Sequence, residues 1–246
     1  MTTQGLHTAY FWRGDALRSR SVSALVLQGQ LDVPALPPRL LADCEREVAH
    51  HLALEPGDVA ALSLARARTR WPQYRQCVQA VADWLGTLGL QQVLADSDVA
   101  LMACRGTRYH HDADQYGSKA FCNLFVSEDS GMDLHFPAAG HLIPLARGTV
   151  LVFDTGQCHA VIPRGGSFKL QAAKVEADAQ IGTQLFLTWE LPIEHAQVAQ
   201  ALQIELDTDP LTASRLEEEQ LWIGGRRAPV CSEDEMDRYG LLTAAR

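Results

Sequence analysis

The chain has 246 residues, a formal net charge of −9 and 47% hydrophobic residues, and its isoelectric point is near 5.4. This length fits one large domain, or one domain with helical attachments, and the apolar content supports a core that needs no disulfides. The acidic charge argues against broad binding to nucleic acid, which requires clustered Lys and Arg. It leaves open a small anionic ligand held by one or two local cations.

The six cysteines indicate the redox compartment. No two of them form a Cys-x-x-Cys pair and several lie inside apolar runs, so we expect them to be reduced and buried, as in a cytoplasmic protein. Residues 1–20 lack the apolar core of a signal peptide, and the chain has no apolar run of membrane length. We therefore expect a soluble intracellular protein with no membrane partner, and a homodimer is left open. The cysteines are Cys44, Cys77, Cys104, Cys122, Cys158 and Cys231.

Residues 1–97 are expected to form an N-terminal helical region packed on a core. From Pro38 to Leu52, apolar residues recur every four positions with charged residues between them, which is a helical period. Pro72 suits the first position of a second helix, and a continuous apolar stripe follows it as far as Leu88. Such helices bury one face against another layer of structure.

From Asp98 the pattern changes to short apolar runs separated by Gly, Pro, Asp and Ser, which is typical of strands joined by turns. About eight such runs predict an antiparallel sandwich or barrel, and the jelly roll is a common fold with eight strands. After Pro192 a helical pattern returns. We therefore expect a β core over 98–191 and a helical or irregular extension over 192–246. The expected strands are 99–104, 120–126, 132–136, 141–145, 149–153, 159–162, 167–172 and 184–190.

A His-x-Asp motif within this β region suggests a metal site. Residues two apart in a strand point the same way, so His110 and Asp112 share a face, whereas His111 points to the other side. Asp114 also falls on the favoured face and could replace Asp112 as a ligand or support it from behind. His110 and Asp112 are therefore the predicted ligand pair.

The third ligand must come from elsewhere in the fold, and His159 qualifies. It follows Gly148–Phe153, an apolar run expected to be buried, and a turn. Two histidines and one carboxylate form the facial triad that holds Fe(II) on one side and leaves the other side open for oxygen and a cosubstrate. His-x-Asp alone occurs by chance, but order, spacing and β context together predict a metal and catalytic centre at His110, Asp112 and His159.

The region 98–191 resembles the double-stranded β-helix core of the 2-oxoglutarate/Fe(II)-dependent dioxygenases, most closely their prolyl-hydroxylase-like branch. After His-x-Asp, that family has a Gly-Gly-Asp/Glu-Leu element, which Gly131–Leu134 resembles. Gly148–Phe153 is similar to the family's Gly-x-x-x-x-Phe strand, and His159–Pro163 is similar to its distal His with Val and Pro after it. The resemblance does not extend to the helical flanks.

The resemblance implies a mainly β fold, with a double-stranded β-helix (jelly-roll) core and flanking α-helices at both ends. It implies that His110, Asp112 and His159 bind Fe(II). It also implies 2-oxoglutarate as cosubstrate, oxidised to succinate and CO2 while a substrate C–H is hydroxylated. The substrate would be a small molecule, an amino acid or a peptide side chain. By analogy, Tyr109 and Asn123 line the cosubstrate cavity.

One position departs from the family pattern. The family binds the distal carboxylate of 2-oxoglutarate with an Arg or Lys on the strand after the distal His. Gln184 stands where that cation is expected, and an amide cannot make a bidentate charged contact. Lys169, on a nearer expected strand, can hold a carboxylate as a point charge, so it is the favoured anchor. Arg164 is a third candidate, beside a Gly-Gly turn.

Other polar residues carry weaker expectations. Tyr116 falls in a segment expected to cover the cavity. His135 either faces the pocket or is an ordinary polar strand position. Asp133 and Asp154 are expected at turns or strand edges.

Two rival functions remain open from the sequence. The departure at Gln184 favours a cupin-type metal enzyme that uses the same roll without 2-oxoglutarate. A catalytically inactive roll that serves as a binding or sensing module is the second rival. Dependence of the reaction on 2-oxoglutarate separates the first rival from the dioxygenase, and retention of iron separates the second.

Overall fold

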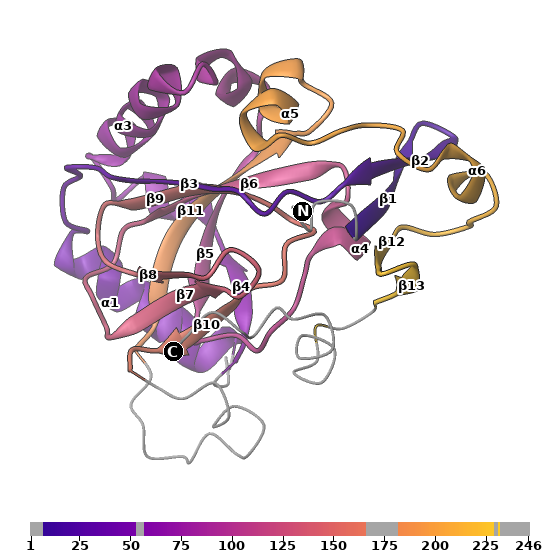
Figure 1. Ribbon diagram of the computed structural model, residues 1–246. Helices are drawn as coiled ribbons and strands as arrows, with labels where there is room; N and C mark the ends of the chain where they lie inside the picture. The colour runs from indigo at the N-terminus through magenta and orange to yellow at the C-terminus, as the bar shows by residue number, and fades with distance from the viewer. Residues whose placement is uncertain (1–6, 53–56, 166–181, 229–230, 232–246) are drawn as a thin grey trace.

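The computed structural model describes residues 7–52, 57–165, 182–228 and 231. Its centre consists of two antiparallel sheets that face each other, and a third sheet is formed by strands near the two ends of the chain (Figure 1). No helix in these described ranges is long and apolar enough to cross a membrane.

The two facing sheets contain most of the strands that the sequence predicts. The larger sheet has the order β3-β9-β6-β11-β5-β4, and the smaller has the order β10-β7-β8. The larger sheet comprises β3 (Val26–Gln30), β4 (Val59–Leu62), β5 (Val99–Cys104), β6 (Lys119–Phe125), β9 (Thr149–Asp154) and β11 (Gln184–Pro192). The smaller comprises β7 (Met132–Phe136), β8 (His141–Pro144) and β10 (Ala160–Pro163). The strand expected over 167–172 lies outside the described residues.

The connectivity of these sheets is that of a jelly roll. An isolated antiparallel bridge between His110 and His159 adds a fourth strand position beside β10. From β5 onward the chain then passes between the sheets in the order large, small, large, small, small, large, small, large. Eight strand positions divided equally between two sheets define this fold. The predicted mainly β, double-stranded β-helix core is confirmed.

Side chains along the strands of the large sheet alternate between two hydrophobic clusters, one on its outer face and one between the two sheets. On β6, Cys122 and Leu124 face outward with a cluster that includes residues of α1 (Pro38–Glu47) and α3 (Tyr74–Thr87). Phe125 faces inward, into a second cluster between the two sheets. The predicted helices therefore cover the outer face of the large sheet. The second begins at Tyr74 rather than at Pro72. Shorter turns are the π-helix Val48–Leu52, α2 (Leu64–Arg68) and the 3-10 helix Gln91–Asp96.

The two flanks contain strands in addition to the helices that the sequence predicts. Four strands precede residue 97, and β3 and β4 extend the large sheet. The others, β1 (His7–Arg13) and β2 (Ala16–Ser21), join β12 (Gln220–Ile223) and β13 (Arg226–Arg227) in a sheet of order β13-β12-β1-β2. Helices α5 (Ala196–Leu202) and α6 (Pro210–Ala213) lie in the C-terminal extension, as expected.

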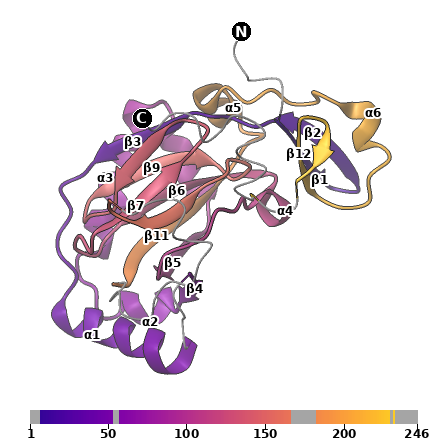
Figure 2. The ribbon, with the colours of Figure 1, turned by 60° about the horizontal axis from the view of Figure 1, so that its bottom comes forward.

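This terminal sheet, β1 with β2, β12 and β13, is set to one side of the roll, with the short helix α4 (Ala113–Tyr116) between them (Figure 2). Its Ala9 and Leu221 cluster with Ala113, the residue after Asp112. Gly117 permits the close approach, because a Cβ there would lie 2.9 Å from the Cβ of Phe11. The terminal sheet thus packs against the segment that carries one predicted metal ligand.

A buried ion pair ties the terminal sheet to the roll. Arg20 on β2 is fully buried and donates to both carboxylate oxygens of Asp154, at 2.7 Å each, and to the carbonyl of Gly117 at 2.7 Å. Asp154 also accepts the backbone N–H groups of Ser23 and Gly156, each at 2.8 Å. Asp154 is the last residue of β9, which agrees with its expected position at a strand edge. Its side chain is fully buried.

Replacing Asp154 by Asn should lower the free energy of unfolding by about 3–5 kcal/mol, because the guanidinium of Arg20 would remain buried without a counter-charge. Urea denaturation of the two proteins measures this difference. Asp207→Asn is the matched control, since Asp207 pairs with Arg18 on the same strand but is half-exposed, and exposed pairs contribute little. Equal losses in the two variants would contradict the special role of the buried pair.

Candidate metal centre

The three predicted ligands meet where the bridge between His110 and His159 lies beside α4. Their ligand atoms all lie within 4.8 Å of one another. The Nε2 atom of His110 is 3.7 Å from one carboxylate oxygen of Asp112, and the Nε2 atom of His159 is 3.6 Å from the other. Donor atoms about 2.1 Å from one ion on one face of an octahedron lie about 3 Å apart. A small contraction of this group would therefore enclose a single ion.

Both histidines are held in the tautomer that a metal requires. The Nδ1 atom of His110 is 2.8 Å from the carbonyl of Arg108, and that of His159 is 2.9 Å from the carbonyl of Gln157. A carbonyl oxygen only accepts, so each Nδ1 carries the proton and donates it. Each Nε2 then presents its lone pair toward Asp112, which is how metal-binding histidines are usually oriented.

Backbone hydrogen bonds fix the three ligands relative to one another. The N–H of His110 donates to the carbonyl of His159 at 3.0 Å, and the N–H of His159 returns the bond at 2.9 Å. The N–H of Asp112 donates to the carbonyl of Thr155 at 2.8 Å, in the turn that follows Asp154. The buried Arg20–Asp154 pair therefore lies one residue away from the bond that positions Asp112.

The structure brings the predicted ligands together by a different local geometry from the one assumed. Asp112 is not in a strand with His110: it immediately precedes α4, with φ −107° and ψ 8°. His111 points away, as expected, and its Nε2 is 2.7 Å from the carbonyl of Ala228. Asp114 is exposed and lies outside the group of donor atoms. Asp114 is therefore not the alternative ligand that the strand pattern allowed.

Burial controls the protonation of the distal histidine. His159 is 6% exposed, and desolvation, followed by the neighbouring charge of His110, lowers the pKa of His159 to about 4. Asp112 opposes this shift, because a negative charge favours the protonated ring. His159 is thus neutral near pH 7 and needs no deprotonation before it binds a metal ion.

A cavity of about 270 Å³ lies between the two sheets and contains the triad on its wall. Its floor is built from cross-strand pairs of β11 and β6: Glu190 with Phe121, Thr188 with Asn123, and Phe186 with Phe125. The full lining is Val59, Ala61, Ala100, Met102, Cys104, Thr107, His110, Asp112, Tyr116, Phe121, Asn123, Phe125, Leu134, Phe153, His159, Val161, Phe186, Thr188 and Glu190.

Asn123 lines this cavity, as predicted. Its side chain is 7% exposed, and its Oδ1 atom has no hydrogen-bond partner among the described residues. An unpaired buried amide oxygen costs free energy, so this group is suited to a ligand inside the cavity. Tyr116 also contributes to the wall; its pKa is raised by burial and by the charges of Glu190 and Asp112.

Tyr109 does not line the cavity, which corrects the expectation from the sequence. Its hydroxyl is 2.6 Å from Nδ1 of His135, and its ring clusters with Cys158 and Ile162 on the other side of the small sheet. Because neighbouring strand residues point to opposite sides, the inward position of His110 places Tyr109 outward. His135 shares that outward site and is likewise absent from the cavity lining.

Two of the three candidate anchors for a distal carboxylate are occupied by other groups. Gln184 is fully buried, accepts from the hydroxyl of Ser127 at 2.8 Å and donates to the hydroxyl of Ser130. Arg164 forms ion pairs with Asp129 and Asp133, at 2.7 and 2.8 Å, and these bonds raise the pKa of Arg164 further above its ordinary value. Lys169 lies outside the described residues, so its role stays a prediction.

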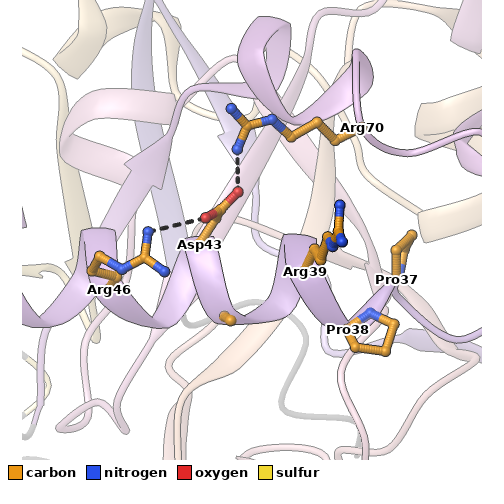
Figure 3. Close-up of a pocket in the computed structure, with 7 residues that line it drawn as sticks. Pro37, Pro38, Arg39, Asp43, Arg46 and Arg70 are labelled. Carbon is orange, nitrogen blue, oxygen red and sulfur yellow. Dashed lines mark hydrogen bonds and ion pairs between the residues drawn. The ribbon is translucent and has the colours of Figure 1, made fainter.

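A second hollow lies on the outside of the molecule, over α1 (Figure 3). Asp43 in this hollow is paired with Arg46 and Arg70, so its carboxylate is already neutralised. The hollow contains no part of the predicted metal centre. It is lined by Pro37, Pro38, Arg39, Ala42, Asp43, Arg46 and Arg70.

No family model matches the sequence, and the curated proteins give no match. Among solved structures, the chain is similar to a prolyl-4-hydroxylase of Pseudomonas putida, with 21% identity, a TM-score of 0.41, and coverage of 68% of this chain and 91% of the other. It is also similar to the 2-oxoglutarate complex of a viral collagen prolyl hydroxylase of Paramecium bursaria Chlorella virus-1, with 11% identity, a TM-score of 0.38, and coverage of 68% and 94%.

A third similar structure is the non-heme alpha-ketoglutarate-dependent epimerase SnoN of nogalamycin biosynthesis, with 15% identity, a TM-score of 0.34, and coverage of 85% and 91%. The resemblance predicted from the sequence agrees with these findings. At such low identities and TM-scores the likeness does not carry a function to this chain. The function proposed below therefore rests on this chain's own residues.

Replacing His159 or Asp112 by Ala should abolish binding of one Fe(II) or Mn(II) ion per chain, because each is one of the three predicted protein ligands. Anaerobic calorimetric titration of the metal-free protein measures this. His111→Ala is the matched control: it removes an adjacent imidazole that bonds the carbonyl of Ala228, and it should retain the metal. Loss of the metal in His111→Ala, with the fold intact by circular dichroism, would show that the ligand assignment is wrong.

The metal-free protein should lose stability as the pH falls from about 6.5 toward 4. Burial lowers the pKa of both His135 and His159 to about 4 from an ordinary value of 6.5, so in this range the unfolded chain binds more protons than the folded one. Denaturation at several pH values measures the slope. His135→Gln should reduce that slope, and an unchanged slope in this variant would contradict the buried neutral state of His135.

Proposed function

We propose that this protein is an Fe(II)- and 2-oxoglutarate-dependent dioxygenase that hydroxylates a C–H bond of its substrate. One observation carries the proposal: His110, Asp112 and His159 gather their donor atoms within 4.8 Å at the wall of a cavity between two sheets. Two imidazoles and one carboxylate on one side leave the other coordination positions free, which is the ligand set of non-haem Fe(II) oxygenases.

The donor set fits Fe(II) better than it fits a structural zinc, Mg²⁺ or Ca²⁺ ion. A structural zinc site would need a fourth protein ligand, and thiolates are the usual choice. Cys158 is adjacent to His159 in sequence, but it belongs to the outward cluster with Tyr109. Mg²⁺ and Ca²⁺ prefer oxygen donors, and two neutral imidazoles do not match that preference. The ion would therefore be a transition metal with open positions that face the cavity.

Bound Fe(II) would supply the oxygen chemistry: 2-oxoglutarate, O2 and the substrate C–H give succinate, CO2 and the hydroxylated product. The chain's own residues bind, orient and exclude water. His110 and His159 are pre-set with Nε2 free. Asn123 offers an unpaired amide oxygen, which can accept a hydrogen bond from an O–H or N–H group of a ligand in the cavity. The apolar floor around Phe125 and Phe186, whose rings stack at 5.1 Å, keeps that part of the cavity dry.

A cupin-type reaction without 2-oxoglutarate remains the second candidate. The observation that favours it is that two candidate anchors for the distal carboxylate already have partners. Gln184 is hydrogen-bonded to Ser127 and Ser130. Arg164 is paired with Asp129 and Asp133. These bonds leave Lys169 as the candidate cation for the distal carboxylate. Under our proposal, the substrate is a small molecule, an amino acid or a peptide side chain.

Succinate release by the purified protein should require both Fe(II) and 2-oxoglutarate, because in the proposed reaction succinate is formed only from 2-oxoglutarate at the metal centre. Mass spectrometry of succinate measures this. Asp112→Ala should remove the activity, and His111→Ala should retain most of it. A protein that binds iron but forms no succinate under these conditions would support the cupin-type alternative, and a protein that binds no iron would support an inactive module.

Lys169→Ala should raise the 2-oxoglutarate concentration needed for half-maximal succinate release by about tenfold to a hundredfold, equivalent to about 1.4–2.7 kcal/mol. A dicarboxylate in a partly dry cavity needs a cation opposite its distal end. Arg164→Ala is the matched control, because that guanidinium is engaged by Asp129 and Asp133. A larger effect of Arg164→Ala would move the anchor to Arg164.

A further inference from the structure

Glu190 is a carboxylate on the cavity wall that the metal centre does not use. It lies on β11, directly across from Phe121 on β6, and Phe121 lies across from Phe153 on β9. All three side chains line the cavity. The Glu190 backbone N–H bonds the carbonyl of Asp98. Within the described part of the chain, no hydrogen bond or ion pair engages the Glu190 carboxylate.

A continuous aromatic wall connects Glu190 to the metal centre. The rings of Tyr116 and Phe121 meet edge to face at 5.0 Å, Phe121 and Phe153 at 6.0 Å, and Phe153 and His159 at 5.1 Å. Neighbouring strands are about 4.8 Å apart, so Glu190 lies about 10 Å across the sheet from Phe153. A ligand that reaches Glu190 from the metal must therefore lie along these rings.

The charge on the wall selects the kind of group that can bind beside Glu190. Apart from the triad, Glu190 is the charged residue in the described lining, which contains no Lys and no Arg. An unpaired carboxylate in a partly buried site is costly, and a cation both removes that cost and gains from the faces of Tyr116 and Phe121. A second carboxylate there would be repelled by Glu190 and by Asp112.

We propose that Glu190 determines substrate specificity by binding a positively charged amine or guanidinium group, with the apolar part of the substrate along the rings of Phe121 and Phe153. This extends the proposed function, because it assigns a substrate class to the same cavity. It also separates two regions of the cavity. The cationic end of the substrate lies at Glu190, and the anionic cosubstrate lies by the metal.

Binding of three probes with the same carbon chain tests this assignment. Hexylamine is cationic at pH 7, hexanol is neutral and hexanoate is anionic. Wild-type protein should bind hexylamine at least about tenfold more tightly than hexanol, and hexanoate most weakly, as measured by competition in ligand-observed NMR. Glu190→Gln should remove the preference for hexylamine, and Glu190→Lys should reverse the order in favour of hexanoate. The titrations are made without metal and again with Mn(II).

Glu217→Gln is the matched control, because it removes the same charge from an exposed residue outside the cavity lining, and it should leave the order of the probes unchanged. Equal binding of hexylamine and hexanol by the wild type, or an unchanged preference in both Glu190 variants, would overturn the assignment. Because these measurements need no turnover, failure to release succinate would reject the proposed oxidation and leave the role of Glu190 to be decided by the probes alone.

Discussion

The ion pair between Arg20 and Asp154 is the contact on which the geometry of the predicted metal centre depends. Arg20 joins β2 to the end of β9 and, through the Gly117 carbonyl, to the end of the segment that carries Asp112. The carboxylate of Asp154 also accepts the N–H of Gly156 and so holds the turn after β9. Thr155 lies in this turn, and its carbonyl accepts the N–H of Asp112. Burying these two charges costs desolvation free energy, which their mutual hydrogen bonds offset. In return, the pair holds the segments that carry the predicted ligands in fixed positions.

The roll was predictable because its strands have strong local signals. The expected runs over 99–104 and 132–136 coincide with β5 and β7, and those that correspond to β6, β9 and β11 match within two residues. Strict alternation separates side chains on opposite faces, which is why His110 could be distinguished from His111 as a ligand, and His159 could be identified because it follows the buried strand β9 and a turn. The same period explains the placement of Asn123 in the cavity.

The remaining parts depend on contacts that a local pattern does not contain. Asp112 reaches the metal centre through a bend before α4 rather than along a strand. The strands of the terminal sheet are short and pair with strands about 200 residues away. Their signals were the two-residue loops Gly14-Asp15 and Gly224-Gly225, where glycines with positive φ form tight turns. Tyr109, which the family resemblance placed in the cavity, alternates with the inward-facing His110 and therefore faces outward.

The central claim is that one metal ion and 2-oxoglutarate share the cavity between the two sheets. A crystal structure of the protein soaked anaerobically with Mn(II) and 2-oxoglutarate tests it most directly. We expect one ion about 2 Å from Nε2 of His110, Nε2 of His159 and the carboxylate of Asp112, with 2-oxoglutarate on its open side within the cavity. An ion bound by other residues, or a cavity that excludes 2-oxoglutarate while the ion is present, would contradict it.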